Sequence, residues 1–130
     1  MNILNQPKTN ADPHKKNAVA LKAFFAITAQ WGLSAEEEKP LLNVAPSTFY
    51  LWKREKAGSL SQDTLERISY ILGIYKALHI LLPSEQAANE WIKKPNNAPL
   101  FNGKRALDKL MQGRVMDLAD VRRYLDAERG

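Results

Sequence analysis

The residue types that carry covalent or metal chemistry are scarce in this chain. Its 130 residues include no cysteine and two histidines, His14 and His79. Without cysteine there is no disulfide, thiolate zinc site, iron–sulfur cluster or thiol nucleophile, which fits a reducing compartment. Two histidines are too few for most catalytic metal sites, which combine several histidine or carboxylate ligands. The sequence therefore predicts neither a metal nor a cofactor.

Two short motifs have an enzymatic interpretation, but a simpler one fits each better. Gly103-Lys104 looks like the end of a phosphate-binding loop. Position 98 is alanine, however, and position 105 is arginine, so the G-x-x-x-x-G-K-[ST] motif fails. The glutamates at 36–38 are typical of a solvated first helical turn, where negative charge favours the helix dipole. No set of nucleophile, base and acid suggests itself, so we predict that the protein is not an enzyme.

The composition is that of an ordinary globular domain, with 45% apolar and 25% charged residues. Nineteen Lys and Arg against fourteen Asp and Glu give a net charge of +5, which permits a nucleic acid or an acidic partner. Residues 1–17 lack the apolar run of a signal peptide. The most apolar stretch, residues 71–82, is too short to span a bilayer. We expect a cytoplasmic protein with no membrane partner.

Apolar spacing and capping signals predict an all-α fold. Residues 1–16 are polar and contain two prolines, so we expect a flexible leader. Apolar positions three and four apart predict a first helix from Asn17 to Trp31, which Gly32 ends. Ser34 and Glu37 form a capping-box pattern for a second helix that reaches residue 42. The remaining helices are expected over residues 46–56, 61–82, 83–94, 104–112 and 118–128, with Ser61 as the cap of the second of these and Asp117 as the cap of the last.

The second and third predicted helices are joined by a turn of about four residues, as in a helix-turn-helix. Phe49 and Trp52 should face inward together with Val44. The outward positions at the start and end of the third helix suit base and phosphate contacts. These candidate DNA-binding residues are Ser47, Thr48, Tyr50, Lys53 and Arg54. A helical hairpin that never contacts DNA is the alternative interpretation.

The long helix at 61–82 is apolar almost all round in its second half, so it must be covered on more than one side. The second cover is either the C-terminal half of the chain or another copy of it. A single helix-turn-helix with few basic residues binds DNA modestly, so specific binding calls for a homodimer on two half-sites. The candidate dimer interface is Ile71, Ile74, Tyr75 and Leu78.

The chain thus divides into a leader (1–16), a helix-turn-helix and dimerisation region (17–82) and a small C-terminal helical domain (83–130). The last domain is rich in aromatic, glycine and aliphatic residues. Most of these should form a small core of Trp91, Phe101, Leu107, Leu110 and Leu118. The final helix ends in Arg129-Gly130, and we expect it to be presented to a partner.

Taken in order, these patterns resemble the Xre antitoxins of bacterial RES–Xre toxin–antitoxin pairs, whose second half is a toxin-binding domain shared with the MbcA and ParS antitoxins. The helix-turn-helix part is generic, whereas the C-terminal run is distinctive. The resemblance covers about residues 18–130. It is carried by LNVAPSTFYLWK at 42–53, LERI at 65–68, IYKAL at 74–78, WI at 91–92, PN at 95–96, FNG at 101–103, LMQG at 110–113 and VRRYLDA at 121–127.

The resemblance implies a dimeric antitoxin. Its N-terminal half would bind the operator DNA of its own operon. Its C-terminal half would sequester a cognate RES-domain toxin that degrades NAD⁺, and the C-terminal end would obstruct the toxin active site. The toxin-binding residues carried over are Phe101, Gly103, Arg122, Tyr124, Asp126, Arg129 and Gly130. The alternative is a plain helix-turn-helix transcriptional regulator whose C-terminal half only dimerises or senses a ligand.

Overall fold

The computed structural model describes residues 12–130, and over that range the chain folds into helices with no strand. The all-α prediction is confirmed. In chain order the elements are α1 (Pro13–Gln30), α2 (Ala35–Leu42), α3 (Pro46–Glu55), α4 (Gln62–Leu81), α5 (Glu85–Glu90), the 3-10 helix η2 (Trp91–Lys93), α6 (Ala106–Leu110) and α7 (Val115–Glu128). Within the described range, none of these helices is both long and apolar enough to cross a bilayer.

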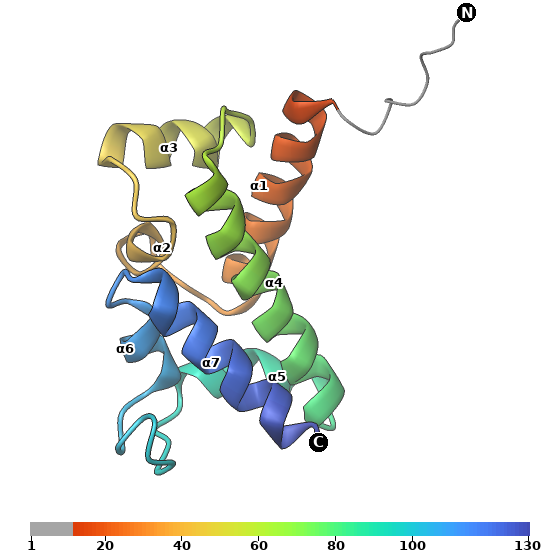
Figure 1. The fold of residues 1–130 in the computed structure, drawn as a ribbon, viewed down its shortest axis with the longest axis vertical. Coiled ribbons are helices and arrows are strands. Elements are labelled where there is room, and N and C mark those ends of the chain that lie inside the picture. The colour runs from red at the N-terminus through yellow and green to blue at the C-terminus, as the bar shows by residue number, and fades with distance from the viewer. Residues whose placement is uncertain (1–11) are drawn as a thin grey trace, which may run out of the picture.

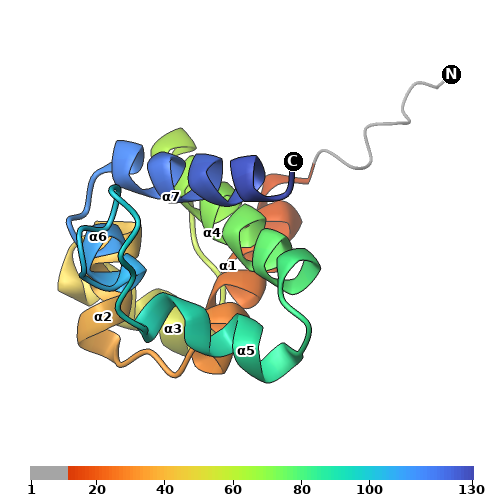
Figure 2. The same ribbon diagram turned by 90° about the horizontal axis from the view of Figure 1, so that it is seen from below.

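Helix α4 runs through the centre of the molecule and is packed against both halves of the chain (Figure 1). Its most extensive packing is with α7, followed by α1. Seen from below, α7 and α5 lie on opposite sides of the bundle (Figure 2). The C-terminal half of the same chain therefore provides the second cover that the apolar sequence of α4 requires.

This packing corrects the expected dimer interface. Ile71, Ile74 and Leu78 have no exposed surface, because other helices of the same chain cover them. They have no accessible surface for contact with a second copy, so their assignment to a dimer interface is wrong. Tyr75 keeps part of its surface, and its hydroxyl donates a hydrogen bond to Oε1 of Gln30 at 2.8 Å.

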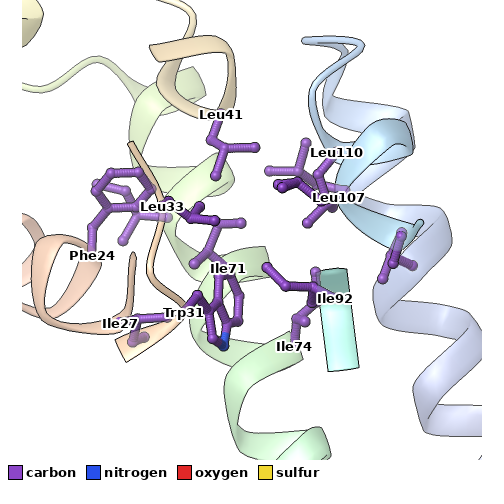
Figure 3. Packing of buried hydrophobic residues seen from close by; sticks show 14 of the residues in the cluster. Phe24, Ile27, Trp31, Leu33, Leu41, Ile71, Ile74, Ile92, Leu107 and Leu110 are labelled. Carbon is purple, nitrogen blue, oxygen red and sulfur yellow. The ribbon is translucent and has the colours of Figure 1, made fainter. Parts of the chain in front are cut away.

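One contiguous apolar core joins the two halves (Figure 3). Phe24 and Leu41 enter it from the helix-turn-helix half, Ile71 from α4, and Leu107 and Leu110 from α6. Four members of the expected C-terminal core are buried, whereas Trp91 is only partly so. Because apolar side chains of both halves form a single cluster, the two halves share one core instead of having separate ones.

Two helices begin earlier than predicted. Helix α1 begins at Pro13, since Asp12 accepts hydrogen bonds from the backbone N–H groups of His14 and Lys15 and proline suits the first helical position. Residues 13–16 are therefore helical rather than part of a leader, and residues 1–11 lie outside the described range. Helix α7 begins at Val115, before the expected cap Asp117.

Glu38 also differs from the prediction. The capping box of Ser34 and Glu37 is confirmed by a reciprocal pair of hydrogen bonds. Glu38, however, is 2% exposed instead of solvated. Its carboxylate accepts hydrogen bonds from Oγ1 of Thr28 and from Nζ of Lys53, both at 2.5 Å. This buried carboxylate therefore links α1, α2 and α3.

Replacing Glu38 with alanine should lower the free energy of unfolding by about 1–3 kcal/mol, because the buried Thr28 hydroxyl loses its shorter hydrogen bond and is left with the one to the Phe25 carbonyl at 3.3 Å. Urea denaturation measures the difference. Glu36 is the matched control, since its side chain is 79% exposed and pairs with Lys39 at the surface. Glu36→Ala should change the stability by less than about 0.5 kcal/mol. Equal losses in the two variants would contradict the structural role of Glu38.

Asp117 should make stability depend on acid pH. Burial by itself raises the pKa of this carboxyl, but hydrogen bonds from Arg114 and Lys109 outweigh burial and lower it below its usual value. A lowered pKa in the folded state adds stability above the unfolded-state value, near pH 3.9, and that stability is lost as the pH falls through the folded-state value.

Asp117→Asn should therefore destabilise the protein by about 1–3 kcal/mol at pH 7 and flatten the fall in stability below about pH 4. Urea titrations at pH 7, 5, 4 and 3 measure both effects. Glu128→Gln, at an exposed position of the same helix, serves as the control and should keep the wild-type profile. An Asp117→Asn profile parallel to the wild type would disprove this role.

Candidate DNA-binding and protein-binding surfaces

Helices α2 and α3 form the helix-turn-helix, and the turn between them depends on Asn43. This residue is in the left-handed conformation at φ 53°, which asparagine tolerates better than most residues. Its backbone N–H donates to the carbonyl of Lys39 at 2.9 Å and closes α2. Pro46 then begins α3 with its φ already suited to a helix.

The inward face of α3 is as predicted. Phe49 is fully buried and packs edge-on against Phe25, with ring centroids 5.9 Å apart, while Trp52 is 5% exposed. Helix α3 ends at Glu55, and Gly58 lies in the loop that follows it. A Cβ atom on Gly58 would lie 2.1 Å from Nε1 of Trp52, so only glycine lets the chain cross the indole at this distance.

The five candidate DNA-binding residues all lie on α3, but they do not present a uniformly free surface. Ser47, Tyr50 and Arg54 are exposed, whereas Thr48 and Lys53 are half-buried. The Lys53 ammonium is turned toward Glu38 in the ion pair described above. Arg54 is paired with Glu55 of the same helix at 3.2 Å. Much of the positive charge of α3 is thus neutralised within the chain.

Lys39 and Leu51 extend this surface. Lys39 lies with Nζ 5.1 Å from the ring centroid of Tyr50 and 2.9 Å from Glu36. Hydrogen bonds to Glu36 and then to Tyr50 raise the pKa of Lys39, so it stays charged. Leu51 is 44% exposed beside Tyr50, and helical spacing could have placed it outward in advance.

In the C-terminal half, Tyr124 of α7 packs in a cluster of three aromatic rings. Phe101 is 3% exposed and packs edge-on against both other rings, with its centroid 5.8 Å from that of Trp91 and 5.2 Å from that of Tyr124. Tyr124 also stacks on Trp91 at 6.3 Å. Phe101 is therefore placed to orient Tyr124 rather than to contact a partner directly.

The loop before α6 closes on itself around Asn96. The backbone N–H of Gly103 donates to the carbonyl of Asn96 at 2.8 Å, and the N–H of Asn96 donates to the carbonyl of Lys104 at 3.0 Å. Gly103 has a φ of 83°, which favours glycine. Gly103 thus holds the loop that carries Phe101, and the structure does not bring it to the arginines of α7.

A second group lies on the flank of α7 that faces α4. Asp126 accepts from Nε of Arg122 at 3.1 Å and from Nη1 of Arg129 at 3.4 Å. These residues are spaced by four and three positions, so they share one face of the helix. Gly130 follows at φ 89°, and a Cβ built on it would meet nothing within 4 Å. The candidate toxin-binding residues of α7 therefore lie on two flanks, with Tyr124 on one and Arg122 and Asp126 on the other, whereas Phe101 and Gly103 belong to the loop before α6.

Sequence reasoning missed Gly73, which lies beneath Arg122. A Cβ atom at Gly73 would be 1.8 Å from Nη1 of Arg122, so the guanidinium covers the backbone of α4 at this point. The available signal was the glycine itself, because an isolated glycine in an apolar helix is unfavourable and usually has a packing or functional reason.

Comparison with known proteins gives a family for each half of the chain. Residues 12–73 match the antitoxin Xre-like helix-turn-helix domain, and residues 77–130 match the antitoxin Xre/MbcA/ParS C-terminal toxin-binding domain. The chain is 44% identical over 131 residues to uncharacterized protein y4oB of Sinorhizobium fredii (strain NBRC 101917 / NGR234), covering 98% of this chain and 99% of the relative. Both domain families are non-enzymatic. The chain belongs to the Xre family of antitoxins, with a helix-turn-helix half and a toxin-binding half.

Proposed function

We propose that this antitoxin neutralises a RES-domain toxin that degrades NAD⁺, and that the end of α7 obstructs the entrance to the toxin active site. The observation that carries the proposal is the charged group at the end of α7. Arg122, Asp126 and Arg129 keep 35%, 42% and 35% of their side-chain surface exposed. Partly exposed arginines on a well-packed helix suit acidic side chains at the entrance of a nucleotide site.

Obstruction needs no catalysis by this chain, but it does need a preformed helix end. Helix α7 meets this requirement because Leu118, Val121 and Leu125 anchor it in the core. A helix that is ordered before binding loses less conformational entropy in the complex. The same packing means that removing residues 118–130 would expose the core, so single substitutions at the surface are the sharper test.

The first experiment is to express the chain from its native operon with an N-terminal tag and to identify what co-purifies at high salt. We expect a stoichiometric protein that degrades NAD⁺ once separated and stops when the antitoxin is returned. A toxin of another chemistry would overturn the RES assignment. A chain that retains its promoter fragment but no protein partner would favour the plain regulator.

Charge reversal at Arg129 tests the obstruction. Arg129→Glu should weaken toxin inhibition by at least about tenfold, since a central interface arginine commonly contributes this much. Arg123→Glu is the matched control, because Arg123 lies on the same helix, pairs with Asp120 and is 69% exposed. Titration of NAD⁺ hydrolysis by the toxin measures both. Unchanged inhibition by Arg129→Glu would count against obstruction by the end of α7.

We also infer that α3 binds the promoter of its own operon as a homodimer and represses it. The exposed start of α3 suits base and phosphate contacts, and the internal pairing of its cations keeps the affinity of one unit modest. Two half-sites in a dimer would supply the missing affinity and specificity. The dimer interface has to use surface other than the buried residues of α4.

Arg54→Ala should weaken promoter binding and reduce the salt dependence of affinity by about one phosphate contact. Binding to the operon's promoter fragment over a range of salt concentrations measures this. Lys94→Ala is the control, because Lys94 is exposed in the C-terminal half and pairs with Glu90. A salt slope that is the same in Arg54→Ala and wild type would remove Arg54 from the interface. Sedimentation of the chain with DNA tests the dimer, and a bound monomer would contradict it.

A further inference from the structure

We infer that Gly73 is a positioning residue for toxin binding. Because Gly73 has no side chain, the guanidinium of Arg122 lies directly on the backbone of α4, a contact we call the glycine seat. The seat fixes the orientation of the charged group formed by Arg122, Asp126 and Arg129. The toxin-binding part of this inference rests on the proposed function. Gly73 lies at the end of the residues matched by the helix-turn-helix family, so the seat is made by α4 and used by the toxin-binding half.

The geometry of the seat is specific to the guanidinium. A Cβ atom on Gly73 would lie 1.8 Å from Nη1, 2.3 Å from Cζ and 2.7 Å from Nε of Arg122. These are the three nearest atoms, and all three belong to the guanidinium of Arg122. Glycine is the weakest helix former after proline, and its use inside α4 calls for a contact of this kind.

The seat is connected to the last arginine through Asp126. Arg122 is fixed on one side by α4 and on the other by the hydrogen bond from its Nε to Asp126. The other carboxylate oxygen of Asp126 accepts from Arg129. Moving the Arg122 guanidinium therefore leaves Asp126 with one arginine partner and frees the pair to rotate. An interface side chain that is held before binding loses less entropy on binding.

The variant Gly73→Ala separates this role from a purely structural one. The atoms that would clash are the far end of a flexible, half-exposed side chain, so Arg122 can turn into water without disturbing α4. The helix itself gains a better helix former. The fold should therefore tolerate alanine, while the charged group at the end of α7 loses its orientation.

The experiment compares wild type, Gly73→Ala, Arg122→Ala and the double variant, with Ser69→Ala as the matched control at an exposed position one turn earlier on α4. The readouts are the melting temperature, binding to the operon's promoter fragment, and inhibition of the toxin that co-purifies from that operon. We expect Gly73→Ala to leave the melting temperature and promoter binding unchanged and to weaken toxin inhibition at least about tenfold. Both single variants disrupt the same contact between Arg122 and α4, so the double variant should inhibit the toxin no less well than Arg122→Ala alone.

A readout without toxin keeps the inference separate from the proposed function. In the full-length protein, solvent exchange of the Arg122 Nε–H, followed by nuclear magnetic resonance, should be slow in wild type and faster in Gly73→Ala. Equal exchange rates would overturn the seat, whatever the partner proves to be. Wild-type inhibition by Gly73→Ala, or losses that add in the double variant, would overturn the positioning role. A toxin that is not a NAD⁺-degrading enzyme would overturn the proposed function. The exchange rate of the Arg122 Nε–H and the inhibition of the co-purified toxin would still test the role of Gly73.

Discussion

The structure depends on covering α4. This helix is apolar on nearly every side, and a helix of that kind is stable in water only between other elements. Helix α1 covers one side and α7 another, so the DNA-binding and toxin-binding halves share one core. A change that loosens α7 should therefore weaken the support of the helix-turn-helix as well. The same arrangement removes Ile71, Ile74 and Leu78 as a dimer interface.

Ion pairs within the chain reduce the net positive charge on both candidate binding surfaces, the one on α3 and the one at the end of α7. Glu38 of α2 pairs with Lys53 of α3, and Asp126 pairs with Arg122 and Arg129 at the end of α7. Such pairing lowers the net positive charge that a partner meets, but it fixes the direction of side chains that would otherwise move freely. Surface ion pairs contribute little stability, so the orientation of the arginines matters more than their energy in the folded state.

The toxin-binding half uses two different means of support on the two flanks of α7. Tyr124 is held by ring contacts with Trp91 and Phe101, which are apolar and insensitive to salt. Arg122 is held by a glycine seat and a carboxylate, which salt and substitution affect more readily. A partner that contacts both flanks of α7 would bind a rigid aromatic side chain, Tyr124, on one flank and the more mobile charged group of Arg122, Asp126 and Arg129 on the other.

The sequence by itself determined the all-α class, the Ser34–Glu37 capping box, the inward face of α3 and the family, because these depend on spacing and motifs within short stretches. Only the tertiary structure decided that α7 rather than a second copy covers α4, that Glu38 is buried, and that Arg122 rests on Gly73. Periodicity shows that a face is apolar or charged, but not which distant segment meets it. Those partners lie far apart in the chain and are brought together only when the shared core forms.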